Sequence, residues 1–197
     1  MLTLITGGSG SGKSAYAEEY ITSISPEDFR YYIATMKVYD EEGQKKVGKH
    51  RQMRCNKNFV TIEQPSTIEE ALKKIAVFES DNKYDNELEK KQAKKDALLE
   101  CISNLVANEM FVEDSVKDSR EVVIKIISGI KKLNNGVKNL VIVSNNVFED
   151  GITYDDTTMN YIETMGKVNE ELAVIADKVI EVVVGIPIII KDTDRKI

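Results

Sequence analysis

The most constraining feature of this 197-residue chain is a glycine-rich segment at residues 7–14, which reads GGSGSGKS. It matches the pattern G-x-x-x-x-G-K-[ST]. A short apolar run at residues 2–6 precedes it, and residues 14–21 carry Ala, Tyr and Glu at helical density. A strand, loop and helix in this order direct backbone N–H groups at phosphates near the positive end of a helix. We therefore predict a P-loop that binds a nucleotide.

The residue types of the loop predict their roles. Lys13 reaches the β and γ phosphates, and Ser14 holds Mg²⁺. A P-loop also needs an acidic group near the metal, and Glu100 is the best placed candidate, because it ends the apolar run Ala97-Leu98-Leu99. The alternative is that Glu100 only ends a strand. The predicted phosphate-binding residues are Gly7, Gly8, Ser9, Gly10, Ser11, Gly12, Lys13 and Ser14.

Short apolar runs alternate with helical segments along the rest of the chain. We expect strands at residues 2–6, 31–35, 59–63, 97–101, 140–144, 179–184 and 187–190. Ser66 and Glu69 form a capping box ahead of a helix, and residues 40–54 are predicted to form a polar helix. This alternation is typical of an α/β protein with a mostly parallel sheet. We predict a P-loop NTPase-like three-layer sandwich, a single domain over 1–197 with a charged, solvated insertion around 80–96.

Two longer helices are expected from apolar residues at helical spacing. The first ends at Gly136, and its predicted buried face is Val123, Ile126, Ile127, Ile130 and Leu133. The buried face predicted for the second is Ile162, Met165, Gly166, Asn169, Leu172, Ala173 and Ala176.

Composition excludes several classes of protein. The net charge of −6 argues against a protein that coats nucleic acid. Two cysteines, Cys55 and Cys101, make no disulfide framework and fit a reducing compartment. No secretory signal is visible, and the longest apolar stretch, residues 179–190, is too short to span a bilayer. We expect a cytoplasmic protein with no membrane span.

His50 is the only histidine, so the chain can build neither a Ser-His-Asp site nor a multi-histidine metal site. On a helix, Lys46 and Arg54 would share its face. A neutral imidazole can attack phosphorus, and neighbouring cations would stabilise the phosphoryl oxygens. From the residues alone, the simpler interpretation is an exposed histidine on a basic helix.

The chain resembles the bifunctional adenosylcobinamide kinase/adenosylcobinamide-phosphate guanylyltransferase family over nearly its whole length. The resemblance rests on the P-loop together with His50 and the trailing Arg51 and Arg54. Other matching segments are Tyr32-Ile33-Ala34-Thr35, Thr61-Ile62-Glu63, Leu98-Leu99-Glu100-Cys101, Asn108, Val143-Ser144-Asn145, Gly166, Asn169 and Gly185-Ile186-Pro187.

The resemblance implies a two-step enzyme with GTP and ATP as substrates and Mg²⁺ as cofactor. Adenosylcobinamide is first phosphorylated. GTP then guanylylates a histidine, by position His50, and GMP passes to adenosylcobinamide phosphate to give adenosylcobinamide-GDP. The family also implies a homotrimer. The further nucleotide-binding residues that it implies are Ala34, Thr35, Met36, Arg51, Gln52, Met53, Arg54, Glu63 and Glu100.

The chain departs from the family pattern in two places. Gly10 stands where many members have Arg. Asn146 and Phe148 replace the Glu and Gly of a Ser/Thr-Asn-Glu-Val-Gly segment, so the guanylyltransferase elements are more complete than the kinase elements. The alternatives are a P-loop small-molecule kinase without a covalent intermediate and a non-catalytic nucleotide-dependent regulatory module.

Overall fold

The computed structural model describes residues 1–25, 30–37, 58–81, 95–113, 115–146, 151–152 and 154–193. Seven strands form one sheet in the order β3-β2-β4-β7-β1-β8-β9. Their bounds are β1 (Leu2–Thr6), β2 (Arg30–Ala34), β3 (Phe59–Glu63), β4 (Asp96–Glu100), β7 (Asn139–Val143), β8 (Lys178–Val183) and β9 (Ile186–Asp192). All neighbouring pairs are parallel except β8 with β9, which confirms the predicted mostly parallel sheet.

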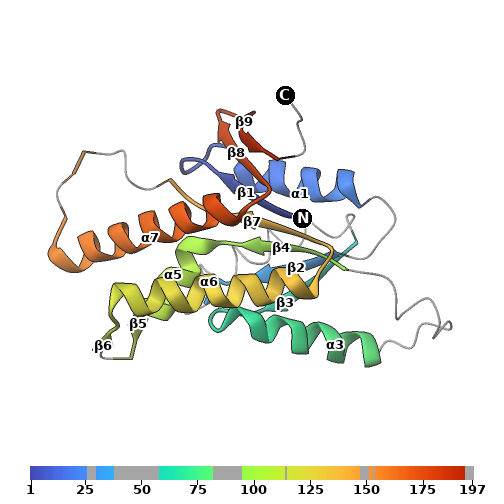
Figure 1. Ribbon diagram of the computed structural model, residues 1–197, viewed down its shortest axis with the longest axis horizontal. Coiled ribbons are helices and arrows are strands. Elements are labelled where there is room, and N and C mark those ends of the chain that lie inside the picture. Colours follow the sequence, from blue (N-terminus) through green and yellow to red (C-terminus); the bar gives the residue numbers. More distant parts are fainter. Residues whose placement is uncertain are drawn as a thin grey trace.

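Helices cover both faces of this sheet (Figure 1). They are α1 (Lys13–Ile24), the 3₁₀ turn η1 (Ile68–Glu70), α3 (Ala71–Asp81), α5 (Ile102–Met110), α6 (Ser119–Gly136) and α7 (Asp156–Ile175). Helix α1 packs on one face, against β1, β4, β7 and β8, whereas α3, α5, α6 and α7 pack on the other. The three-layer α/β architecture is therefore confirmed.

Two apolar cores separate the layers. The core under α1 contains Ile5, Leu98 and Val141, and the larger core under the other helices contains Leu4, Leu99 and Leu140. Successive residues of one strand thus enter opposite cores, because side chains alternate between the faces of a sheet. Every residue of β7 is buried, as expected for a strand covered on both faces.

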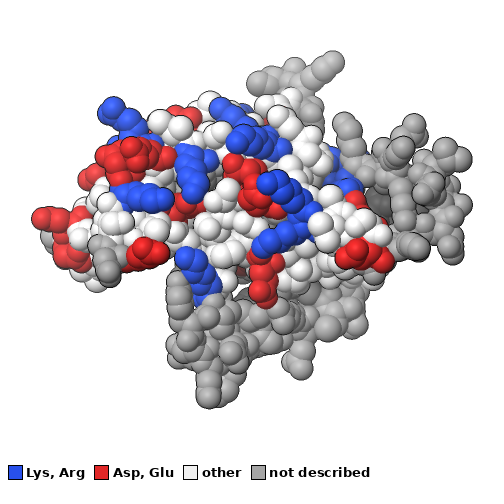
Figure 2. Space-filling view, turned by 90° about the horizontal axis from the view of Figure 1, so that it is seen from below, with Lys and Arg blue, Asp and Glu red and all other residues white. Residues whose placement is uncertain are grey.

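The helix surface below the sheet carries charges of both signs (Figure 2). Lys132 of α6 pairs with Glu69 of η1 at 3.2 Å, and Lys73 of α3 pairs with Glu70 at 2.7 Å. Neither sign dominates this face of the described chain. None of the described helices is long and apolar enough to cross a membrane.

The predicted capping box is wrong. The residue before η1 is Thr67, in a left-handed conformation, and no side chain caps the turn. Instead, the N–H of Thr67 donates to the Glu109 carboxylate at 2.6 Å, so a residue distant in sequence satisfies this end. Glu109 is supplied by α5, whose existence we did not predict because no capping residue precedes it. The hairpin of β5 (Phe111–Val112) and β6 (Ser115–Val116) was also not predicted.

The predicted buried faces of the two long helices are largely correct, and each differs from the structure at one position. On α6, which ends at Gly136 as expected, Val122 is buried and Val123 only half-buried. On α7, Val168 joins Met165 and Leu172 in the core. The helix predicted over 40–54 and most of the predicted insertion around 80–96 lie outside the described residues.

Candidate active site

The carboxyl ends of β1, β2, β3 and β4 meet at one edge of the sheet, because these strands are parallel. This edge is where open α/β sheets bind ligands. The P-loop follows β1, residues 34–36 end and follow β2, Glu63 ends β3, and Glu100 ends β4. The structure thus brings the predicted residues that it describes to one edge.

Two glycines of the P-loop have geometric reasons to be glycine. A Cβ at Gly7 would lie 2.5 Å from the backbone oxygen of Val182 in β8. Gly12 has a φ of +88° directly before α1, a conformation that favours glycine. The loop also donates from Ser11 N to Gly8 O at 3.2 Å. The close approach of β8 at Gly7 and the left-handed backbone at Gly12 therefore account for glycine at these two positions.

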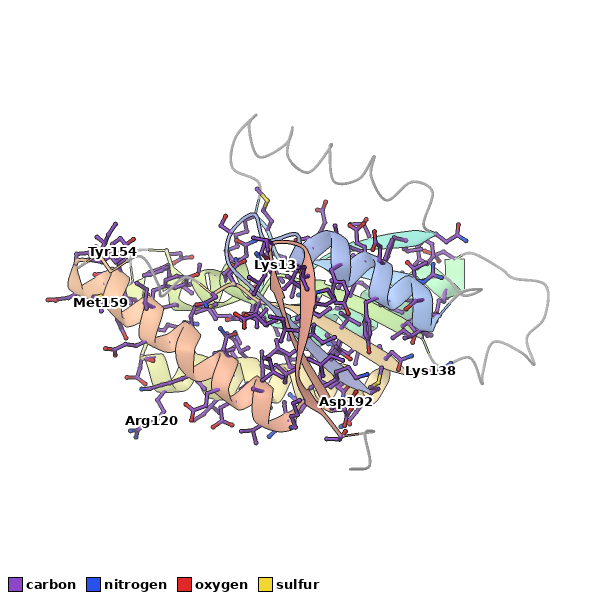
Figure 3. All side chains as sticks on the ribbon, turned by 90° about the horizontal axis from the view of Figure 1, so that it is seen from above. Lys13, Arg120, Lys138, Tyr154, Met159 and Asp192 are labelled. Carbon is purple, nitrogen blue, oxygen red and sulfur yellow. The ribbon has the colours of Figure 1, made fainter. Side chains whose placement is uncertain are left out.

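Lys13 lies at the start of α1, beside the β8–β9 hairpin (Figure 3). Its Nζ donates to Gly8 O at 3.1 Å, and its side chain is buried. Burial lowers the pKa of Lys13. Electrostatic interactions with Cys101 and Glu100 act in the other direction and offset part of this effect. The buried ammonium of Lys13 thus folds back on its own loop.

Ser14 and Glu100 join the P-loop to the end of β4. Ser14 Oγ donates to Glu100 Oε1, and Tyr32 OH donates to Glu100 Oε2 at 2.9 Å. The hydroxyl and carboxylate are oxygen ligands of the kind that Mg²⁺ prefers, and Mg²⁺ usually takes one or two carboxylates plus phosphates. No cluster of three His, Cys, Asp or Glu suited to a metal occurs among the described residues. Ser14 and Glu100 therefore fit a nucleotide-bound Mg²⁺, and they are the residues that would hold it.

The segment after β2 is anchored on both sides. Thr35 Oγ1 donates to Cys101 O at 2.8 Å and accepts from Cys101 N at 2.7 Å. Asn108 of α5 donates from Nδ2 to Thr35 O at 2.8 Å and to Pro65 O at 2.9 Å. Met36 is exposed at the end of this segment. Glu63 lies opposite Ala34 in the sheet and is also exposed, so its carboxylate is accessible.

A cavity of about 540 Å³ lies between the segments that follow β2 and β3, the C-terminal part of α5, the β5–β6 hairpin and α6. Its lining includes Lys37, Asn108 and Phe111. Lys37 directly follows the anchored segment, and Phe111 belongs to the β5–β6 hairpin. The cavity therefore opens next to the predicted nucleotide-binding segment.

The β8–β9 hairpin contacts the P-loop from the side of β1 that faces away from β7 and β4. Gly185 N, at the turn of the hairpin, donates to Ser11 O at 2.8 Å. Val184 beside it is 83% exposed. The hairpin thus forms an apolar rim to the phosphate-binding loop.

The predicted residues His50, Arg51, Gln52, Met53 and Arg54 lie outside the described residues. The structure brings together the remaining predicted residues of the P-loop, Ala34 to Met36, Glu63 and Glu100. Sequence reasoning missed Tyr32 and did not assign a role to Asn108. An apolar strand pattern does not distinguish a tyrosine that packs in a core from one whose hydroxyl holds a carboxylate.

The fold and this site define a P-loop nucleotide-binding protein of the α/β class. The chain belongs to the CobU family, described as cobinamide kinase / cobinamide phosphate guanyltransferase. The family model matches two overlapping stretches, residues 3–80 and 73–190. The match covers nearly the whole chain and confirms the resemblance found in the sequence.

Solved structures support the fold assignment. An ATPase domain aligns with a TM-score of 0.56 at 12% identity, over 99% of this chain and 78% of that one. A DnaB-like replicative helicase, solved to show its interactions with primase, aligns with a TM-score of 0.53 at 11% identity. This alignment covers 91% of the present chain but only 46% of the helicase. No curated protein sequence matches the chain.

Proposed function

We propose that this protein phosphorylates adenosylcobinamide and then transfers GMP from GTP to adenosylcobinamide phosphate, forming adenosylcobinamide-GDP in cobalamin biosynthesis. The observation that carries the proposal is the family match over residues 3–190. It is supported by a P-loop in which Ser14 contacts Glu100 and Lys13 lies buried beside them.

In the kinase step, the hydroxyl oxygen of adenosylcobinamide attacks the γ-phosphorus of ATP or GTP. The bond to the bridging oxygen breaks, the nucleoside diphosphate leaves, and the hydroxyl proton is released. Lys13 stabilises the charge on the phosphates, and the N–H groups of residues 7–14 surround them. When bound by Ser14 and Glu100, Mg²⁺ would neutralise further phosphate charge.

In the guanylyl step, an imidazole nitrogen of His50 attacks the α-phosphorus of GTP and pyrophosphate leaves. A phosphate oxygen of adenosylcobinamide phosphate then attacks the same phosphorus and releases the imidazole. This route replaces one difficult transfer by two displacements. Lys13 would hold the leaving pyrophosphate, and Arg51 or Arg54 the guanylyl group, since guanidinium groups form paired hydrogen bonds to phosphate.

The nucleotide contacts from Ala34, Thr35, Met36, Gln52, Met53 and Glu63 are part of the same proposal. Support comes from the hydrogen bonds of Thr35 to Cys101 and Asn108, which fix residues 34–36 beside Glu100. We further propose that residues 1–197 form one P-loop domain with an insertion around 80–96.

We also propose a homotrimer. Strand β9 ends the sheet, and its Ile186 and Ile190 are 62% and 61% exposed. An edge strand with exposed apolar side chains is usually covered in the functional protein. Light scattering is expected to give three times the mass of the chain, and Ile190→Lys is expected to lower it. A monomeric mass for the unmodified protein would contradict this part of the proposal.

The activity is tested by incubating the protein with adenosylcobinamide, Mg²⁺ and either ATP or GTP, followed by mass spectrometry of the corrinoid. We expect adenosylcobinamide phosphate with whichever of ATP and GTP serves as phosphoryl donor. Adenosylcobinamide-GDP is expected only when GTP is present. Phosphorylation without the GDP product would favour the P-loop kinase alternative. Nucleotide binding without any corrinoid product would favour the regulatory module.

A further inference from the structure

The cavity of about 540 Å³ beside residues 34–37 takes no part in the proposed transfer steps, and its lining is mostly polar. Three lysines, two glutamates, one asparagine and one serine line it, and the apolar residues of the lining are Phe111 and Val112. Sites for flat aromatic ligands are usually the reverse, mostly apolar with a few polar groups. The lining therefore fits a ligand that carries many hydrogen-bonding groups.

One wall of the cavity is a closed arrangement of hydrogen bonds. The Glu109 side chain is only 3% exposed, and its two oxygens accept from Thr67 N and from Lys125 Nζ, each at 2.6 Å. Both N–H groups of Asn108 donate to backbone carbonyls, which leaves its Oδ1 to accept from a ligand. These residues thus shape the wall, and the Glu109–Lys125 pair contributes no free charge.

Three charged side chains of the lining remain available. Within the described part of the chain, Lys37, Glu113 and Lys117 make no side-chain hydrogen bond or ion pair. They come from three separate segments, after β2, after β5 and after β6. Glu113 and Lys117 are exposed, and Lys37 is half-buried.

Free donors and a free acceptor around one space suit a group that both accepts and donates. A primary carboxamide does so, because it carries an acceptor oxygen and two N–H donors. A phosphate offers acceptors, so the Glu113 carboxylate would repel it. The unpaired side chains therefore favour carboxamide groups over a phosphate.

Asn108 connects this cavity with the predicted nucleotide-binding segment. Its Nδ2 donates to Thr35 O at 2.8 Å, and Thr35 N donates to Glu100 O at 3.0 Å. In the sheet, β2 is three strands away from β1, which is about 14 Å at the usual spacing of neighbouring strands. A ligand that occupies the cavity while its hydroxyl reacts at the P-loop must therefore be large.

We propose that this cavity binds carboxamide side chains of the corrinoid acceptor, with Lys37 and Lys117 donating to amide oxygens and Glu113 accepting from amide N–H groups. Adenosylcobinamide carries several carboxamides around a large ring, and its reacting hydroxyl is on a separate arm. The ring can be held at the cavity while the arm extends to the P-loop. Binding here orients the acceptor and moves neither a proton nor a phosphoryl group. The inference rests on the proposed function, since it assigns a site to that substrate.

The first test measures equilibrium binding of cobinamide, followed by its absorbance, to the full chain without nucleotide. Lys117→Met removes one charged donor and is expected to weaken cobinamide binding by about tenfold. The affinity for GTP, measured separately, should not change. Because cobinamide carries no phosphate, a loss cannot come from a phosphate contact. Lys131→Met is the matched control, since Lys131 is exposed on α6 and does not line the cavity, and it should leave both affinities unchanged.

The second test blocks the cavity. Val112→Trp places a large side chain in the lining and is expected to raise the KM for adenosylcobinamide without changing the KM for the nucleotide. Val116→Trp is the control, because Val116 lies on the paired strand β6, is 52% exposed and does not line the cavity.

Unchanged cobinamide affinity in both cavity variants would overturn the inference, even where adenosylcobinamide-GDP is still formed. Equal losses for GTP and cobinamide would assign the cavity to the nucleotide and would also overturn it. If the unmodified protein neither binds nor converts the corrinoid, the proposed function fails together with this inference. The two failures are thus distinguished by the unmodified protein.

Discussion

The hydroxyl of Ser14, in the first turn of α1, donates a hydrogen bond to the Glu100 carboxylate at the end of β4. The second carboxylate oxygen accepts from Tyr32 OH at 2.9 Å. Each oxygen of Glu100 therefore has a fixed partner from a different strand or helix. This contact joins the P-loop to the acidic group predicted for the metal, although the two residues are 86 positions apart.

Replacing Glu100 with Gln is expected to lower kcat/KM by about 100-fold in both proposed reactions. The amide keeps the shape of the side chain but removes the charge that would hold Mg²⁺. Steady-state rates measured over a range of Mg²⁺ concentrations should show a much higher requirement for the metal. Tyr32→Phe, which removes only the hydrogen bond to Oε2, should cause a smaller loss. Unchanged Mg²⁺ dependence in Glu100→Gln would contradict the metal assignment.

Alanine at Gly7 is expected to destabilise the protein by about 1–3 kcal/mol, since its Cβ would lie 2.5 Å from Val182 O. Gly8→Ala is the matched control. A Cβ at Gly8 has no heavy atom within 4 Å, so its effect on unfolding should stay within about 0.5 kcal/mol. Urea denaturation of both variants measures the difference. Equal stability of the two variants would show that β8 does not restrict the loop.

Nucleotide binding at alkaline pH is expected to be accompanied by proton uptake. Burial lowers the pKa of Lys13 in the free protein, so part of the population is neutral as the pH rises towards this value. Phosphate charge favours the ammonium and raises the pKa, so binding adds a proton. Calorimetry in two buffers of different ionisation enthalpy measures this uptake. Lys13→Arg, which stays charged, should show none, and proton release on binding would contradict the assignment.

Replacing Asn108 with Asp is expected to destabilise the fold by about 3 kcal/mol and to raise the KM for nucleotide. The new carboxylate would face two carbonyl oxygens, Thr35 O and Pro65 O, which now accept from the amide. Asn104→Asp is the control on the same helix, because no hydrogen bond of its side chain is found in the described structure. Denaturation and nucleotide kinetics should both separate the two variants, and equal effects would contradict a role for Asn108 in anchoring the segment.

The local features of the fold were predictable from the sequence. The P-loop has a strand before it and a helix after it, and the apolar run of β7 indicates burial on both faces. The hydrogen-bond partners that organise the site were not predictable. Tyr32 contacts Glu100 across 68 positions, and Asn145 contacts Ser103 across 42. These pairs arise from the strand order, and no local periodicity encodes it.

The same reason explains the incorrect prediction at the start of η1. Ser66 and Glu69 have the spacing of a capping box, but the Glu109 carboxylate takes the N–H of Thr67. Glu109 is buried and also pairs with Lys125 of α6 at 2.6 Å. A tertiary contact thus replaces the local cap.

The proposed guanylyl transfer depends on the guanylylation of His50 by GTP. The most direct test is incubation of the protein with Mg²⁺ and GTP labelled at the α-phosphate, followed by denaturation and measurement of bound label and protein mass. We expect a GMP adduct on the unmodified protein that is labile to acid and absent from His50→Ala. Absence of any adduct under conditions where GTP demonstrably binds, or an adduct that persists in His50→Ala, would contradict the account.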